Sequence, residues 1–275
     1  MNMNFKIRLQ LFLRSFFLQT GWNFVKYQNI GLTFVMIPFL KKCYENKAKE
    51  LPSVLTRYLD TFNTHPVMAS FCFGALARQE NNIVDSSAKE KTEEKGEWEA
   101  IKRTLSITTA SIGDRLFWGA LKPLTLLLAL FIWLFLDVSF LEATPSLPNH
   151  TAYIVSGIVA AFVTFNAIAL CVRWIGISLG FNCEPSTCFG LIRFNWNQTI
   201  YYAKRIGVFL AIGMLLFGAY HFLKDFDSFT DIQFIARVIL ISAFVLCSLI
   251  ARRLRVPNMY LYLAAVLIFN IVILF

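Results

Sequence analysis

The residues that could do chemistry in this chain are polar side chains gathered in its first half, ahead of long apolar runs. Asn63, Thr64 and His65 stand directly before Pro66, which ends or kinks a helix and leaves backbone groups without helical partners. Amide side chains and unpaired carbonyl groups can form the hydrogen bonds that an array of sugar hydroxyls requires. The alternative is that these residues cap helices and satisfy broken backbone inside a dry fold, and the sequence leaves both interpretations open.

A second polar position, Asp114, follows Gly113 in a stretch rich in Thr, Ser and Gly. Glycine permits close backbone approach, so we expect the pair to form a hairpin turn in which Asp114 caps a helix beginning at Arg115. A carboxylate that accepts hydrogen bonds from sugar hydroxyls is the alternative role. An ionisable group at membrane depth is a functional candidate by default.

Gln19, Trp22 and Asn23 form a third polar group near the N-terminus. An aromatic platform flanked by amide donors suits a sugar ring, although a tryptophan belt at the membrane interface explains Trp22 equally well. Six residues are therefore the predicted substrate-binding positions: Gln19, Asn23, Asn63, Thr64, His65 and Asp114.

No catalytic residue, metal or cofactor is predicted. The first half contains no nucleophile paired with a base, no phosphate-binding glycine loop and no metal-ligand cluster, which disfavours a membrane-tethered enzyme. The six cysteines include no CxxC pair. His65 could titrate near neutral pH, but phosphorylation of a sugar by histidine needs an accessible soluble domain, so we assign His65 no catalytic role.

The composition indicates that a membrane is the solvent of this protein. Of its 275 residues, 57% are hydrophobic and 16% are charged, and the mean hydropathy is +0.57. The net charge is +9, but the cations flank apolar runs and form no stripe interleaved with exposed aromatic residues. Nucleic-acid binding is therefore not expected, since basic loops beside membrane spans are common.

The first half divides by composition into four stretches. Residues 5–17 suggest a basic amphipathic helix lying in the membrane interface, with a cleaved signal peptide as the alternative. Residues 41–60 form a basic, helix-favouring loop that we expect in the cytoplasm. Residues 79–103 suggest a solvated helix or flexible linker, and residues 105–120 suggest a hairpin that enters the membrane within protein.

The second half contains five apolar segments long enough to cross a hydrocarbon core of about 30 Å at about 1.5 Å per residue. They are Leu124–Leu141, Ala152–Val172, Ile206–Leu223, Ile232–Ile250 and Val256–Phe275. Basic and non-basic connections alternate between them. The positive-inside bias then places Arg173–Arg205 and Arg252–Arg255 in the cytoplasm and the C-terminus outside.

These patterns together predict an all-α integral membrane protein. Residues 1–123 form an N-terminal region of interfacial amphipathic helices and re-entrant hairpins, and residues 124–275 form a region of about five transmembrane helices.

Four strings of residues, in order along the chain, resemble the D subunit of the mannose/fructose/sorbose family of sugar phosphotransferase systems. The resemblance covers roughly residues 14–181, and the remainder is similar only in hydropathy. The strings are Arg14 to Asn23 with Tyr27 to Gly31 and Pro38; Tyr58 to Pro66 with Ala69, Ser70 and Gly74; Ser111 to Gly119 with Lys122 and Pro123; and Phe165 to Asn166 with Arg173 to Gly176 and Gly180 to Phe181.

The resemblance implies a sugar-transporting permease subunit in the inner, cytoplasmic membrane of a bacterium. In such systems a C subunit and the D subunit together form the membrane path. Soluble A and B domains relay phosphate through histidines and phosphorylate the sugar, a hexose or hexosamine, on the cytoplasmic side. The D subunit is not itself phosphorylated. The implied partners are therefore the C subunit, the A and B domains, the sugar and membrane lipid, in a hetero-oligomer.

Two stretches depart from the family pattern. Residues 107–111 replace a stretch expected to contain glycine and proline, Arg115 stands where a small residue is usual, and Arg78–Asn81 contains one acid where two are expected. The alternative hypothesis is therefore a non-transporting relative that acts as a regulatory or scaffold protein in the membrane.

Overall fold

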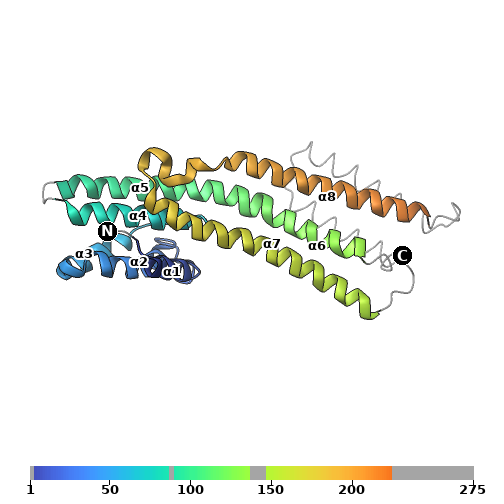
Figure 1. Cartoon of the computed structure of the whole chain (residues 1–275), viewed down its shortest axis with the longest axis horizontal. Helices are drawn as coiled ribbons and strands as arrows, with labels where there is room; N and C mark the ends of the chain where they lie inside the picture. The colour runs from blue at the N-terminus through green and yellow to red at the C-terminus, as the bar shows by residue number, and fades with distance from the viewer. Residues whose placement is uncertain (1–2, 87–89, 137–146, 225–275) are drawn as a thin grey trace. The chain divides into compact units, whose positions relative to one another are not determined.

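The computed structural model describes residues 3–86, 90–136 and 147–224, and within these ranges the chain is helical with no β-strand (Figure 1). A compact unit spans Met1–Met214, and the core and the site described below belong to it. The helical elements are α1 (Phe5–Ser15), α2 (Asn29–Cys43), η1 (Glu45–Glu50), α3 (Leu51–Tyr58), α4 (Ala69–Asp85), α5 (Glu90–Gly113), η2 (Asp114–Leu121), α6 (Lys122–Leu136), α7 (Leu147–Asn182), η4 (Pro185–Arg193) and α8 (Trp196–Lys224).

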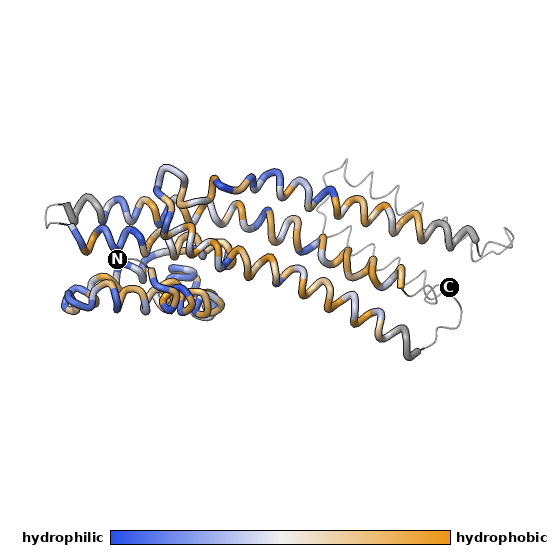
Figure 2. The backbone as a smooth tube through the Cα atoms, in the orientation of Figure 1, coloured by the Kyte–Doolittle hydropathy of each residue, from blue (hydrophilic) through white to orange (hydrophobic). Residues whose placement is uncertain are grey.

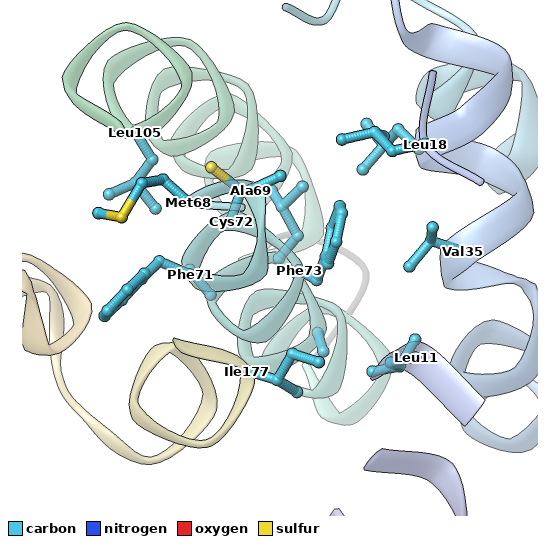
Figure 3. Packing of buried hydrophobic residues seen from close by; sticks show 14 of the residues in the cluster. Leu11, Leu18, Val35, Met68, Ala69, Phe71, Cys72, Phe73, Leu105 and Ile177 are labelled. Carbon is cyan, nitrogen blue, oxygen red and sulfur yellow. The ribbon is translucent and has the colours of Figure 1, made fainter. Parts of the chain in front are cut away.

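Helix α4 lies at the centre of the hydrophobic core because it is buried on several faces. It packs against α2, α5 and α7. Figure 3 shows its side chains reaching toward Leu105 of α5 on one side and toward Leu18 and Val35 on the other. The contact with α7 is close because small residues stand at the crossing. A Cβ atom on Gly74 would lie 2.3 Å from the backbone oxygen of Ile177.

Helices α5, η2 and α6 form one continuous helix, and the prediction of a hairpin at residues 105–120 is wrong. Gly113 has helical backbone angles, φ −63° and ψ −46°, and the helix widens after it to the π pattern of η2. Asp114 therefore lies inside a helix and does not cap one. Continuing the helix buries Leu116 and Phe117 in the core, a gain that a turn at this point would forfeit.

Three helical stretches are long and apolar enough to cross a membrane among the described residues: Lys95–Trp133, Thr151–Asn182 and Pro185–Phe217. Figure 2 shows apolar residues along α6 and α7, and polar residues along α4, on the first part of α5 and at the start of α8. These stretches overlap the first three predicted spans. The predicted spans at 232–250 and 256–275 lie outside the described residues, and the side of the membrane at which the chain ends stays a prediction.

Helix α1 is amphipathic, as the sequence indicates, and its inner face is fixed to α7 by two arginines. Arg173 donates hydrogen bonds to the backbone oxygen and Oγ of Ser15, at 3.1 and 3.0 Å. The Arg8 guanidinium lies 4.0 Å from the ring centroid of Trp174. The expectation that the connection between membrane spans begins at Arg173 is therefore wrong, because α7 continues to Asn182 and Arg173 is buried. The cytoplasmic side of this connection stays a prediction.

The expectation that residues 79–103 form a solvated helix or linker is also wrong for the parts that lie against the core. Glu80, near the end of α4, is fully buried, and Trp98 of α5 is 1% exposed. Charged residues dominate this stretch, so its hydrophobic periodicity is weak. The burial of single residues in it therefore cannot be predicted from the sequence. Helix α5 runs unbroken across residue 113 into α6, and the functional division at residue 123 stays a prediction.

Candidate functional site

The segment between α3 and α4 carries Asn63, Thr64 and His65, and the side chain of Gln28 holds it in place. The Thr64 N–H donates to Gln28 Oε1 at 3.0 Å, and Gln28 Nε2 donates to the Thr64 carbonyl at 2.9 Å. The Thr64 hydroxyl lies 2.7 Å from the hydroxyl of Thr109 on α5. Thr64 is buried, so its hydrogen bonds fix the segment to two other elements and favour the structural interpretation of this residue.

The loop of residues 22–28 is joined to the same segment. Its backbone is organised by Asn23, whose Oδ1 accepts from Lys26 N at 2.8 Å and whose Nδ2 donates to Asn29 Oδ1 at 2.9 Å. Asn29 in turn donates to the carbonyl of Leu59 at 2.7 Å, and Gln28 N donates to the carbonyl of Phe62 at 2.8 Å. Asn23 therefore stabilises the loop of residues 22–28 and, through Asn29, its connection to the segment between α3 and α4.

His65 is enclosed by residues of η2. Its ring stacks on Phe117 with centroids 4.9 Å apart and meets the edge of Trp118 at 5.4 Å. Gly113 faces it so closely that a Cβ there would lie 2.3 Å from the His65 Cβ, which explains the glycine without a turn. His65 Nδ1 accepts from Val67 N at 3.3 Å, while Nε2 is buried and has no hydrogen-bond partner in the described part of the chain.

Burial lowers the pKa of His65 from 6.5 to about 4, and the nearby charge of Arg173 lowers it further in the same direction. The unfolded chain therefore binds more protons than the folded chain between these values, and stability falls as the pH falls from about 6.5 to 4. At pH 5 the loss is about 2 kcal/mol from this group.

The His65→Gln variant should lack this part of the pH dependence of stability, because its side chain does not titrate. Thermal unfolding of both proteins at pH 7 and pH 5 would measure the difference. The same pH dependence in the variant and the wild-type protein would contradict the lowered pKa of His65.

Asn63 is exposed and lies at the edge of a cleft of about 880 Å³ between α3 and α5. We call this the α3–α5 cleft, and its size is in the range of small-molecule sites. Its lining combines hydroxyl, amide, charged and aromatic side chains: Ser53, Thr56, Arg57, Asp60, Thr61, Phe62, Asn63, Trp98, Glu99, Lys102, Arg103, Ser106, Ile107 and Ala110.

A buried polar cluster that the sequence did not reveal supports one wall of the cleft. Glu80 accepts from Arg57 Nη2 at 2.6 Å and from Tyr44 Oη at 2.8 Å. The guanidinium of Arg57 also lies 4.5 Å from the ring centroid of Trp98. Burial raises the pKa of Glu80, and the hydrogen bonds and the positive charge of Arg57 oppose that rise. The sequence departs from the family pattern at Arg78–Asn81, in this region, but the departure did not indicate that Glu80 is buried.

The structure brings together some of the predicted site residues and not others. Thr64 and His65 are adjacent and buried, and Asn63 opens onto the α3–α5 cleft beside them. Asn23 reaches the same segment through Asn29. Gln19 and Asp114 are exposed, and in the described part of the chain neither side chain makes a hydrogen bond with the other predicted positions. Gln28 and Thr109, both buried and polar, complete the arrangement.

A helical fold with three membrane-length stretches among the described residues, enclosing a polar segment, defines an integral membrane protein of the all-α class. A family model described as the mannose/fructose/sorbose family IID component of the phosphotransferase system (PTS) matches residues 3–221. The match covers most of the chain, and the chain therefore belongs to this family. The resemblance noted in the sequence is confirmed.

Three curated relatives agree with this assignment. The fructose permease IID component of Bacillus subtilis (strain 168) is 30% identical over 62% of this chain and 54% of its own length. The PTS sorbose-specific EIID component of Klebsiella pneumoniae is 30% identical over 63% and 55%. The PTS mannose-specific EIID component of Escherichia coli (strain K12) is 27% identical over 62% and 53%. The chain spans about half the length of these curated relatives.

Two solved structures share the fold. One is a cryo-electron microscopy structure of the mannose transporter ManYZ with microcin E492, with a TM-score of 0.51, 23% identity, and coverage of 78% of this chain and 70% of that chain. The other is described as a membrane protein, with a TM-score of 0.56, 23% identity, and coverage of 78% and 71%. The prediction of an all-helical membrane protein is confirmed.

Proposed function

We propose that this chain is the D-type membrane subunit of a mannose-family phosphotransferase permease. It forms, with a C-type subunit, the path for uptake of a hexose or hexosamine. The observation that carries the proposal is the family match over residues 3–221, together with the fold shared with a structure of a mannose transporter. Sugar phosphorylation is the work of soluble A and B domains, so the chain contributes binding and passage and is not itself the phosphotransferase.

The geometry supports a different role for each of the three residues in the segment before α4. Asn63 presents an exposed amide, which offers donors and an acceptor to sugar hydroxyls. Thr64 is held by Gln28 and Thr109, so it positions Asn63 and has no open hydrogen-bonding groups to offer a ligand. His65 is neutral at physiological pH because of its lowered pKa, and its unpartnered Nε2 is the second candidate contact for the sugar.

The family assignment also sets the location that we propose. The chain is a multi-pass protein of the bacterial inner membrane, in contact with lipid, and the basic residues 41–60 face the cytoplasm with the chain ending outside. The three membrane-length helical stretches support this location.

The test is reconstitution of uptake. The chain is co-expressed with its C-type subunit and soluble phosphotransfer proteins, and phosphoenolpyruvate-dependent accumulation of sugar phosphate is measured for a panel of hexoses and hexosamines. Accumulation of at least one is expected. No accumulation for any of them would reject the transport proposal and leave the scaffold alternative, which gains no support from the relatives described above.

Within this assay, Asn63→Ala should lower uptake about tenfold, because losing a hydrogen bond to a bound sugar leaves its hydroxyl unpaired. The matched control is Asn182→Ala, an exposed asparagine at the end of α7. Equal uptake by Asn63→Ala and wild-type protein, at equal amounts in the membrane, would remove Asn63 from the site.

A further inference from the structure

The α3–α5 cleft contains a buried cation, Lys102, that forms no ion pair within 4.0 Å with a carboxylate of the described residues. Lys102 is 6% exposed, yet its ammonium makes one hydrogen bond, to the carbonyl of Asp60 at 3.1 Å. It also lies 5.4 Å from the ring centroid of Trp98. In the described part of the chain no ion pair within 4.0 Å involves Lys102. An ammonium has three donors, so this group is suited to an anionic ligand.

Two other charged residues of the cleft form ion pairs, and those that remain carry a net positive charge. Arg57 is held by Glu80 at 2.6 Å, and Asp60 faces Lys26, from outside the cleft, at 3.7 Å. What remains are the adjacent cations Lys102 and Arg103 and one carboxylate, Glu99. Glu99 lies one helical turn before the two cations, but it makes no ion pair within 4.0 Å among the described residues.

The rest of the lining is suited to hydroxyl groups. Ser53, Thr56, Thr61 and Ser106 contribute hydroxyls, and Asn63 contributes its amide. A neutral sugar would use these groups and leave one positive charge of the Lys102, Arg103 and Glu99 set unbalanced. A phosphate monoester carries a charge of about −1.5 to −2 at pH 7 and three strong acceptor oxygens, which two adjacent cations can bind.

We propose that the α3–α5 cleft binds a sugar phosphate, with the phosphate between Lys102 and Arg103 and the sugar hydroxyls toward Asn63. This inference rests on the proposed function, because a phosphotransferase permease generates a sugar phosphate beside its membrane path. The cleft receives this product at the exit from the path. Residues 53–60, which contribute to one wall, belong to the stretch 41–60 expected in the cytoplasm, where the phosphorylated sugar is released.

The test uses the full chain purified with its C-type subunit in lipid nanodiscs. Isothermal titration calorimetry measures binding of mannose 6-phosphate, fructose 6-phosphate and glucosamine 6-phosphate, each against its unphosphorylated sugar, and of inorganic phosphate. At least one sugar phosphate should bind about tenfold more tightly than its sugar, because charge-assisted hydrogen bonds are strong. Inorganic phosphate should bind more weakly than that sugar phosphate, because it lacks the hydroxyls that the cleft recognises.

Two variants locate the phosphate. Arg103→Gln and Lys102→Gln should each weaken sugar-phosphate binding about tenfold and leave binding of the unphosphorylated sugar unchanged. Because Lys102 is buried, its variant also tests folding, so the exposed Arg103 decides the result alone. The matched control is Lys95→Gln, an exposed lysine on α5 outside the cleft. An equal loss in Lys95→Gln would show a general effect of net charge and overturn the proposal.

The proposal is overturned if none of the three sugar phosphates binds more tightly than its sugar, if Arg103→Gln has no effect, or if inorganic phosphate binds as tightly as the sugar phosphate. Accumulation of sugar phosphate in the uptake assay without such a preference would refute this inference alone. The absence of both uptake and sugar binding would refute the proposed function.

Discussion

The Gly74→Leu variant should fail to reach the folded state in detectable amounts. A Cβ at residue 74 would lie 2.3 Å from the backbone oxygen of Ile177 and 2.6 Å from the backbone nitrogen of Phe181, both on α7. Neither atom can turn aside as a flexible side chain can, so α4 and α7 would have to separate. Extra atoms in a packed core typically cost about 1–3 kcal/mol, and a clash with backbone should exceed that. The total stability of a domain is only about 5–15 kcal/mol.

Size-exclusion chromatography and thermal unfolding of detergent-extracted protein would measure this effect. The matched control is Gly213→Leu in α8, because a Cβ there meets no atom of the described residues within 4 Å. That variant should elute and unfold like the wild-type protein. Wild-type behaviour of Gly74→Leu would show that the close crossing of α4 and α7 does not exist.

The Glu80→Met variant should lose about 3 kcal/mol of stability, because it removes one partner of a buried ion pair. Arg57 would keep its charge with only 13% of its side chain exposed, and the hydroxyl of Tyr44 would lose its acceptor. Methionine has a similar volume, so the loss comes from the unpaired groups and not from a cavity. A lowered melting temperature in thermal unfolding is the expected measurement.

A double variant separates the ion pair from the packing. Arg57→Met combined with Glu80→Met removes both charges and should recover much of the lost stability, since apolar replacement of a buried pair is often neutral. Glu45→Ala removes the exposed partner of Lys42 and should leave the melting temperature unchanged, because exposed pairs contribute little. A double variant less stable than Glu80→Met would contradict this account of the cluster.

These two variants act on either side of the middle of α4, and both positions support the candidate site. Gly74 lets α4 lie against α7, and Glu80 holds Arg57 and therefore the wall of the α3–α5 cleft. The segment with Asn63, Thr64 and His65 leads directly into α4. A shift of α4 would therefore disturb Thr64 and its bond to Thr109 on α5.

Much of the architecture was predictable because a membrane imposes long apolar segments. The apolar runs predicted helical membrane spans, and three such stretches are present in the described residues. The predicted hairpin at Gly113 failed because its glycine serves a different purpose, the close approach of His65. Glycine signals both a turn and a tight contact, and only the partner across the contact distinguishes them.

The candidate site was predictable in part. The string before Pro66 predicted Asn63, Thr64 and His65 as substrate-binding residues, and that role stays a prediction. The hydrogen bonds of Thr64 within the protein favour a structural role for this residue. The roles of Gln28, Thr109 and Glu80 could not be derived because their partners lie 36, 45 and 23 residues away in the sequence. Hydropathy reports on local composition and carries no signal for a hydrogen bond between distant residues.

The sequence by itself determined the solvent, the helical class and the family of this protein, because these depend on composition, segment length and the order of short motifs. Only the tertiary structure decided which polar residues are enclosed and which face a cleft. Burial depends on the crossing of α4 with α5 and α7, which brings residues from distant parts of the chain within a few ångströms. That proximity lowers the pKa of His65 and places Lys102 in the cleft with no carboxylate of the described residues within ion-pair distance.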